Sequence, residues 1–209
     1  MDGLLLDTER VCSEAFVEVT DAYGVAADRA EAFFLTLVGT SSLVTRKGII
    51  EFIDGVDIDR FVHDWHDVMH RLMAGGVPVK PTVAETIGRM AQDGHRMAVV
   101  TSTGGARARD HLGEAGLLAH FSLVVGGDEV TANKPDPAPY LHAADRLGVD
   151  PARSVAFEDS DRGVASATAA GCTVVQIPDL RPPGQPFPAL GQRSAKDLRG
   201  AVFGLGLMA

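Results

Sequence analysis

Basic side chains are scarce in this sequence relative to acidic ones. Nineteen Lys and Arg residues stand against 28 Asp and Glu residues, and the formal net charge is −9 at neutral pH. The longest basic run is only Arg46-Lys47. A nucleic-acid-binding surface needs clustered cationic side chains, so we expect no nucleic-acid partner.

Cysteines and long apolar runs are also scarce. The two cysteines, Cys12 and Cys172, lie far apart and show no metal-ligand spacing, so we expect two reduced thiols. No stretch approaches the ~20 consecutive apolar residues of a membrane span, and the amino terminus lacks the pattern of a signal peptide. We therefore expect a cytoplasmic protein, a monomer or weak dimer, with no membrane partner.

Residues 10–76 are predicted to form a compact helical module, because apolar residues recur at steps of three and four and no strand pattern interrupts them. The hydrophobic fraction of 45% allows a substantial core. The predicted helices run from Arg10 to Gly24, from an Asp28 N-cap to a break at Gly39, from Ser41 or Ser42 past Val44, Ile49, Ile50 and Ile53, and from Ile58 to Ala74.

From Val77 onward, short apolar runs alternate with helical segments. The predicted strands are Met97–Val100, Phe121–Val125, Ser154–Phe157 and a last strand, Thr173–Ile177; the predicted helices are Val83–Gln92, a segment ending near Gly116, Pro137–Leu147 and Gly163–Ala170. Such alternation is typical of βαβ units, so the fold class is α/β with a Rossmann-like parallel sheet. In these sheets, loops at the carboxyl ends of strands form the site. The proline-rich stretch 178–191 is predicted to be a surface loop.

Two of these loops offer groups that can bind an anion. Thr101-Ser102-Thr103 is followed by two glycines, so hydroxyls and free backbone N–H groups would stand at a helix start. An ordinary helix cap is the alternative for this loop. Lys134 is bracketed by Asn133 and Pro135, and the prolines stiffen the backbone around a cation that could face a phosphate. Ordinary solvation is the alternative for the lysine.

A third loop holds adjacent carboxylates, Glu158-Asp159, directly after an apolar strand. Two buried carboxylates repel each other and lose solvation, so they require protons or a cation. Mg²⁺ suits them because it binds carboxylate and phosphate oxygens together. N-capping of the next helix by Asp159 or Asp161 could hold alongside. A calcium loop fits poorly, since its twelfth position would be Ala170 rather than Glu.

The chain opens with the nine residues MDGLLLDTE. Together with Thr101, Lys134-Pro135 and Glu158-Asp159, this opening resembles, in order and spacing, the haloacid dehalogenase superfamily. The resemblance covers residues 1–177 and is greatest to the branch with β-phosphoglucomutase and phosphoglycolate phosphatase. It implies an α/β core domain of residues 1–9 and 77–209, with residues 10–76 inserted as a helical cap domain that closes over the site and selects the substrate.

The resemblance also implies a role for each motif residue. Asp2 is expected to be the general acid/base and to bind Mg²⁺ through its carbonyl oxygen, and Asp159, with Glu158, is expected to complete the metal site. Lys134 is expected to neutralise the charge of the nucleophile and phosphate. The residues expected to bind the phosphoryl group or substrate are Thr101, Ser102, Thr103 and Gly3.

In that family, an Asp two residues before Asp2 attacks phosphorus and forms an aspartyl-phosphate. This residue and its apolar strand would precede Met1. We therefore expect a first core strand, with the nucleophile, to be missing from this chain, which leaves unpaired backbone on both neighbouring strands. A start assigned one codon too late is the favoured explanation; a truncated chain and a non-catalytic paralogue are the others.

The expected function is Mg²⁺-dependent phosphatase action on a small phosphorylated metabolite. A sugar-phosphate mutase is an alternative, which Cys12 weakens, because mutases of the branch tend to carry a His there. A haloacid dehalogenase proper is disfavoured by Glu158-Asp159, since carbon–halogen displacement needs no metal. A non-catalytic binding protein remains the last alternative.

Overall fold

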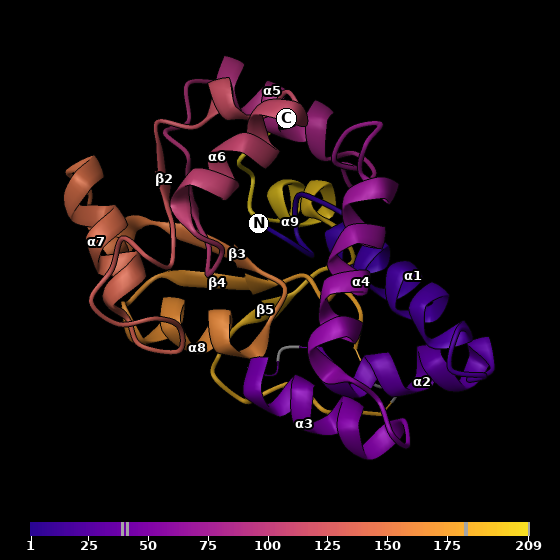
Figure 1. The fold of residues 1–209 in the computed structure, drawn as a ribbon. Helices are drawn as coiled ribbons and strands as arrows, with labels where there is room; N and C mark the ends of the chain where they lie inside the picture. The colour runs from indigo at the N-terminus through magenta and orange to yellow at the C-terminus, as the bar shows by residue number, and fades with distance from the viewer. Residues whose placement is uncertain (39, 41, 182–183, 209) are drawn as a thin grey trace. The chain divides into compact units, whose positions relative to one another are not determined.

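The computed structural model describes residues 1–38, 40, 42–181 and 184–208, which fall into two compact units (Figure 1). Unit 1 consists of Met1–Asp7, Val77–Asp179 and Pro186–Ala209. Unit 2 consists of Thr8–Gly76 and Leu180–Gln185. The helical insert expected from the sequence, residues 10–76, lies within unit 2.

Unit 2 is built from four helices around an aromatic core. They are α1 (Thr8–Asp21), α2 (Ala27–Leu37), α3 (Ser42–Phe52) and α4 (Ile58–Leu72). Phe16 of α1 is fully buried, and its ring lies within 6.1 Å, centroid to centroid, of Phe33, Phe34, Phe61 and Trp65. The apolar residues whose spacing predicted these helices thus form the core of unit 2, because each helix buries one face.

Two details of unit 2 differ from the prediction. Asp28 does not cap α2, because the helix begins one residue before it, with Ala26 at the N-cap and no side-chain cap. On α3, Ile49 is buried but Val44 and Ile50 are half-exposed, because one face of an eleven-residue helix cannot carry all of them. Gly39 and Ser41 lie outside the described residues; Ser42 begins α3.

Unit 1 alternates strands and helices, as predicted. Its helices are α5 (Val83–Gln92), α6 (Gly105–Glu114), α7 (Ala138–Leu147), α8 (Asp161–Ala169) and α9 (Leu198–Gly204), with 3₁₀ turns at Leu118–His120 and Pro151–Arg153. Its strands are β1 (Ala98–Val100), β2 (Leu123–Val125), β3 (Val155–Glu158), β4 (Thr173–Gln176) and β5 (Arg193–Ser194). The expectation that Thr173–Ile177 is the last strand is wrong, because β5 follows the proline-rich loop.

The strands pair in parallel, but the described residues form two sheets rather than one. One sheet is β1–β2, with Ala98 opposite Leu123, and the other has the order β3–β4–β5. Helix α8 covers one face of β3 and β4 (Figure 1), where Val164 and Ala167 pack with Ala156. The α/β class with parallel sheets is therefore confirmed.

The main core of unit 1 combines residues that lie far apart in the sequence, including the first residues of the chain. Leu6, Val99, Leu112 and Val202 belong to one buried cluster, which Met1 also joins.

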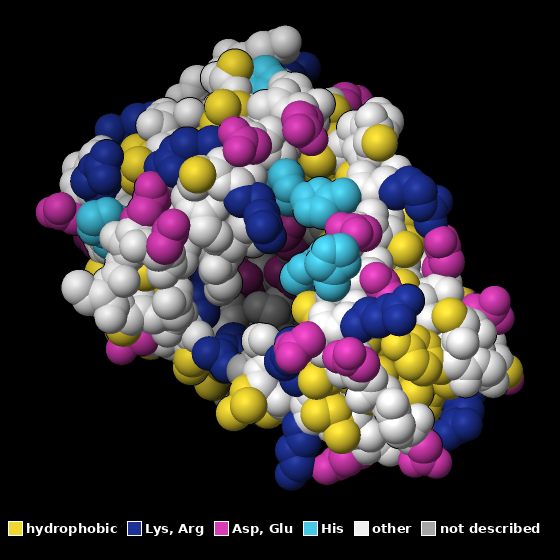
Figure 2. Space-filling model, viewed as in Figure 1, with side chains coloured by type: hydrophobic (Ala, Val, Ile, Leu, Met, Phe, Trp, Pro, Cys, Tyr) yellow, Lys and Arg dark blue, Asp and Glu magenta, His cyan; other side chains and the backbone are white. Residues whose placement is uncertain are grey.

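Within the part of the chain that the structure describes, no helix has the length and apolar character needed to cross a bilayer. On the face shown in Figure 2, Lys and Arg side chains are interspersed with Asp and Glu and make no continuous basic patch.

Candidate active site

The amino-terminal loop of unit 1 comes close to the loop after β3. Gly3 has a φ of +71°, and its N–H donates to the Leu6 carbonyl at 2.9 Å. A Cβ on Gly3 would lie 2.8 Å from Asp159 Oδ2 and 3.0 Å from Asp179 Oδ2. Two features therefore require glycine at position 3: the positive φ of its backbone and the close approach of two carboxylates.

Asp2 is held by the loop after β1. Thr103 Oγ1 donates to Asp2 Oδ2 at 2.8 Å, across 101 residues of sequence. Thr101 is buried, and its Oγ1 accepts the Thr103 N–H at 3.2 Å. The sequence assigned Thr103 to phosphate binding, which stays a prediction; in the structure its hydroxyl donates to the Asp2 carboxylate. Ser102 is exposed beside these two residues.

The start of α6 is engaged by acidic side chains from the loop after β2. Asp128 Oδ1 accepts the Gly105 N–H at 2.7 Å. Glu129 Oε2 accepts the Gly126 N–H at 2.8 Å, and this backbone hydrogen bond is the main reason that the pKa of Glu129 is lowered. The expectation of free N–H groups at this helix start is thus wrong for Gly105 and Thr103. Asp128 was missed, although its place after Gly126-Gly127 at a strand exit could have indicated it.

Lys134 is the cation at the centre of unit 1's polar cluster. It is 7% exposed, and its Nζ donates to the Val100 carbonyl at 3.0 Å and to the carboxylate of Glu158, which is 4% exposed. Tyr140 O–H donates to the same carboxylate oxygen, and its ring centroid lies 5.4 Å from Lys134 Nζ. Arg162 NH2 donates to the Lys134 carbonyl at 2.5 Å. Both Tyr140 and Arg162 were missed in the sequence.

Asp159 follows Glu158 and is partly buried, so its negative charge is poorly solvated. Burial raises the pKa of Asp159 to about 6, and the neighbouring Glu158 carboxylate adds to this, while the Met1 amino group and Lys134 oppose it. Neither Asp159 nor Asp161 caps α8: the cap is Ser160, whose Oγ accepts the Gly163 N–H at 3.1 Å. The capping alternative for these carboxylates is therefore wrong.

A second lysine ties the amino-terminal loop to the end of β4. Lys80 Nζ lies 3.5 Å from Asp7 and makes a close ion pair with Asp179. Neither Lys80 nor Asp179 was predicted from the sequence. Asp179 follows Ile177-Pro178 at a strand exit, which is the position that predicted the other site residues.

The donor set of this cluster fits a divalent cation at Asp159 better than at Glu158. The Glu158 carboxylate is engaged by Lys134 and Tyr140, and a Cβ on Gly163 would overlap its Oε2. Asp159 is partly buried beside the amino-terminal loop, where a cation would reduce the cost of its charge. No ready-made cluster of three or more metal-ligating side chains occurs among the described residues.

Comparisons with known proteins identify the family of the chain. The family model described as haloacid dehalogenase-like hydrolase matches residues 1–177. Protein CbbY of Rhodobacter capsulatus is 34% identical over 92% of this chain and 89% of its own length. The fructose-1-phosphate phosphatase YqaB of Escherichia coli is 33% identical over 85% of this chain and 93% of its own.

A solved structure from Thermotoga maritima, of a protein proposed to be a β-phosphoglucomutase, has a TM-score of 0.81 at 27% identity. The match covers 99% of this chain and 95% of that one. The family model, the sequence relatives and the similar solved structure thus agree on the family of this chain. The chain belongs to the haloacid dehalogenase-like hydrolase family.

Proposed function

We propose that this protein is a Mg²⁺-dependent phosphatase that releases phosphate from a small phosphorylated metabolite. Phosphorylated sugars are the favoured class, because a relative of nearly the same length is named a fructose-1-phosphate phosphatase. The observation that supports the proposal best is the hydrogen bond from Thr103 Oγ1 to Asp2 Oδ2, by which Asp2 contacts the loop after β1. Asp2 therefore lies beside the loop that carries Thr101 and Ser102, the residues proposed to bind the phosphoryl group.

In the first step, an Asp expected just ahead of Met1 attacks phosphorus and forms an aspartyl-phosphate. As the P–O bond of the ester breaks, the leaving alkoxide takes the proton of the Asp2 carboxyl group. In the second step, water attacks phosphorus and its proton passes to the Asp2 carboxylate. Inorganic phosphate leaves, and both aspartates return to their starting states.

The remaining residues hold charge in place during these steps. Thr101 and the Ser102 N–H bind phosphoryl oxygens, and Lys134 neutralises the charge on nucleophile and phosphate. Glu158, together with Tyr140, fixes the Lys134 ammonium rather than serving as the main metal ligand. Asp159 and the Asp2 carbonyl would hold Mg²⁺, which supplies electrostatic stabilisation of the phosphoryl oxygens when bound.

The test compares two lengths of chain with p-nitrophenyl phosphate and Mg²⁺. The 209 residues alone should show negligible turnover, because they carry no nucleophile at the expected place. The chain preceded by an apolar strand ending in Asp should turn the ester over. In that longer chain, Asp2→Asn should lower kcat by about 10²–10⁴-fold. Robust Mg²⁺-dependent activity of the 209 residues that survives Asp2→Asn would overturn these roles.

Metal binding has its own control. In the active, longer chain, Asp159→Asn should raise the Mg²⁺ concentration needed for half-maximal activity by at least roughly tenfold. Asp145→Asn, an exposed carboxylate on α7, should leave it unchanged. A panel of sugar phosphates then identifies the substrate. Conversion of a hexose 1-phosphate without release of phosphate would identify a mutase instead.

A further inference from the structure

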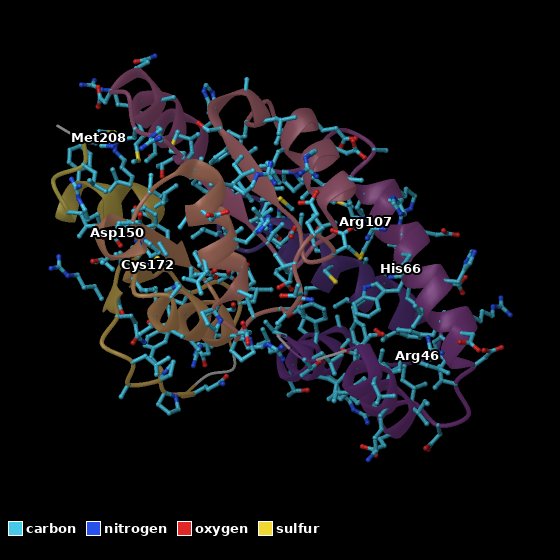
Figure 3. The ribbon with its side chains drawn as sticks, turned by 90° about the vertical axis from the view of Figure 1, so that its left-hand side faces the viewer. Arg46, His66, Arg107, Asp150, Cys172 and Met208 are labelled. Carbon is cyan, nitrogen blue, oxygen red and sulfur yellow. The ribbon has the colours of Figure 1, made fainter. Side chains whose placement is uncertain are left out.

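Helix α4 of unit 2 carries a concentration of histidine. The sequence has seven His residues, and three of them, His63, His66 and His70, lie on this helix. All three side chains are exposed. Figure 2 shows His side chains gathered on the face of the molecule that includes α4, and Figure 3 labels His66 on that helix. Imidazole is a common ligand of late first-row transition metals, so this face of α4 is a candidate metal-binding surface.

The buried face of α4 fixes the direction in which its histidines point. Phe61 is fully buried, and Trp65 is 8% exposed, with its Nε1 donating to the Cys12 carbonyl at 2.9 Å. Since a helix has 3.6 residues per turn, His66 and His70 follow each other at an angle of about 40° around the axis. The helix therefore holds these two imidazoles one turn apart on a single exposed stripe.

Side chains four residues apart on α4 reach the separation of two ligands on one metal ion. Two ligand atoms at about 2.1 Å from a tetrahedral Zn²⁺ lie about 3.4 Å from each other. His63 Nδ1 lies 3.4 Å from Asp67 Oδ2, across this spacing of four residues. His66 and His70 have the same spacing, so rotation of their side chains alone can bring two ring nitrogens to one ion.

Of the three imidazoles, those of His66 and His70 are available to a metal ion. The Nδ1 of His63 is close to two carboxylates, 3.6 Å from Asp64 Oδ1 and 3.4 Å from Asp67 Oδ2. In the part of the chain that the structure describes, no hydrogen bond or ion pair involves the side chain of His66 or His70. A metal ion at these two rings therefore displaces only water.

The charges around the pair do not oppose a cation. Helix α4 contains three Asp and two Arg residues. Arg71, which follows His70, is ion-paired with Glu18 of α1. His70 lies in the last turn of the helix, where the partial negative charge of the terminal carbonyl groups favours a cation.

We infer that His66 and His70 form a two-histidine site for a late first-row divalent cation, such as Zn²⁺, Ni²⁺ or Cu²⁺. Two His residues at positions i and i+4 on one face of a helix are a Zn²⁺-binding pattern. Water completes the coordination, since no group of three or more metal-ligating side chains converges among the described residues. Mg²⁺ prefers oxygen ligands, so this site differs from the one proposed at Asp159. The inference holds whether or not the protein is a phosphatase.

Trp65 provides a reporter of binding, because it is the only Trp of the sequence and directly precedes His66. A Cu²⁺ ion held by an imidazole quenches the fluorescence of a nearby indole. Titration of the 209-residue chain with CuCl₂ in a non-chelating buffer should quench Trp65 in a saturable way, and EDTA should reverse the quenching. Calorimetry should show weaker binding of Ni²⁺ and Zn²⁺ than of Cu²⁺, and excess Mg²⁺ should not compete.

Three variants identify the ligands. His66→Gln and His70→Gln should each weaken Cu²⁺ binding at least roughly tenfold, because loss of a ligand costs no less than loss of a group that orients one. His63→Gln, an exposed imidazole on the same helix, is the matched control and should leave the affinity unchanged. All three positions are exposed, so circular dichroism of the variants should match that of the unaltered chain.

A second measurement needs no variant. In the unaltered chain, Zn²⁺ should shift the ring proton resonances of His66 and His70 in NMR spectra and leave those of His63 in place. Absence of saturable binding, equal Cu²⁺ affinity of the unaltered chain and the three variants, or competition by Mg²⁺ would overturn the inference. A loss of affinity confined to His63→Gln would overturn it as well, since the metal would then lie at another pair.

Discussion

At the scale of single residues, the buried ion pair of Lys134 and Glu158 is expected to contribute strongly to the stability of unit 1. Their side chains are 8% and 5% exposed. Breaking such a pair strands one charge, so Lys134→Met should lower the free energy of unfolding by about 3–5 kcal/mol. Adding Glu158→Gln to that variant should restore part of the loss, because the stranded carboxylate is gone. Urea unfolding followed by circular dichroism measures both.

A surface pair provides the comparison for this prediction. Lys47 and Glu51 lie 3.7 Å apart on α3 with side chains 77% and 67% exposed. Solvent screens that pair, so Lys47→Met should change the free energy of unfolding by less than about 0.5 kcal/mol. A cost for Lys134→Met no larger than this would show that the buried pair is not held as described.

Gly163 sets the position of Glu158 from the opposite side. A Cβ at this residue would overlap Glu158 Oε2, whose carboxylate is already held by Lys134 and Tyr140. Gly163→Ala should therefore lower the free energy of unfolding by about 1–3 kcal/mol, as overpacking does. Gly113→Ala, where a Cβ on α6 meets nothing within 4 Å, should raise it by about 0.5–1 kcal/mol. Thermal unfolding of the two variants should shift in opposite directions.

Residue types at strand exits were predictable, but their partners were not. Thr101, Lys134 and Glu158 were predicted as site residues because they lie in loops that follow apolar strands, and such loops form the site of a parallel sheet. The structure brings Tyr140 to Glu158 and Asp2 to Thr103, contacts 18 and 101 residues apart in sequence. No local pattern encodes such pairs, since they depend on how whole strands and helices are arranged.

At the scale of elements, α6 depends on an acidic cap from a distant loop. Asp128 accepts the N–H of Gly105, the first residue of α6, in a helix without a cap of its own at Gly104. Asp128→Ala should lower the free energy of unfolding by about 0.5–2 kcal/mol. The same change at exposed Asp110 within α6 should be neutral or slightly stabilising, because Ala is the better helix former. Equal effects at the two positions would contradict the cap.

The elements that the sequence missed are short. Strand β5 has two residues, Arg193 and Ser194, too few to show alternation. Helix α9 has a detectable signal: Asp197 accepts the Gly200 N–H at 2.7 Å, and Leu198, Ala201 and Val202 are buried at helical spacing. A helix of seven residues after a proline-rich loop is short, so its apolar pattern covers only two turns.

At the scale of the whole molecule, each unit has its own apolar core: the described residues of unit 2 form one buried cluster, and those of unit 1 form two. The single Trp of the sequence, Trp65, lies in unit 2, where its Nε1 donates to the Cys12 carbonyl at 2.9 Å. Tryptophan fluorescence therefore reports on unit 2, whereas circular dichroism reports on both units. Comparing the two signals in one unfolding experiment therefore distinguishes the unfolding of unit 2 from that of unit 1.

Phe16→Ala should destabilise unit 2 by about 3–5 kcal/mol, because the ring is fully buried among aromatic neighbours and leaves a cavity. The fluorescence transition of Trp65 in urea should move to lower denaturant. Phe203→Ala, whose ring is 45% exposed on α9 of unit 1, should leave the Trp65 transition within about 0.5 kcal/mol of its original position. An unshifted Trp65 transition in Phe16→Ala would show that the ring is not the centre of that core, since removal of a fully enclosed phenyl group cannot be neutral.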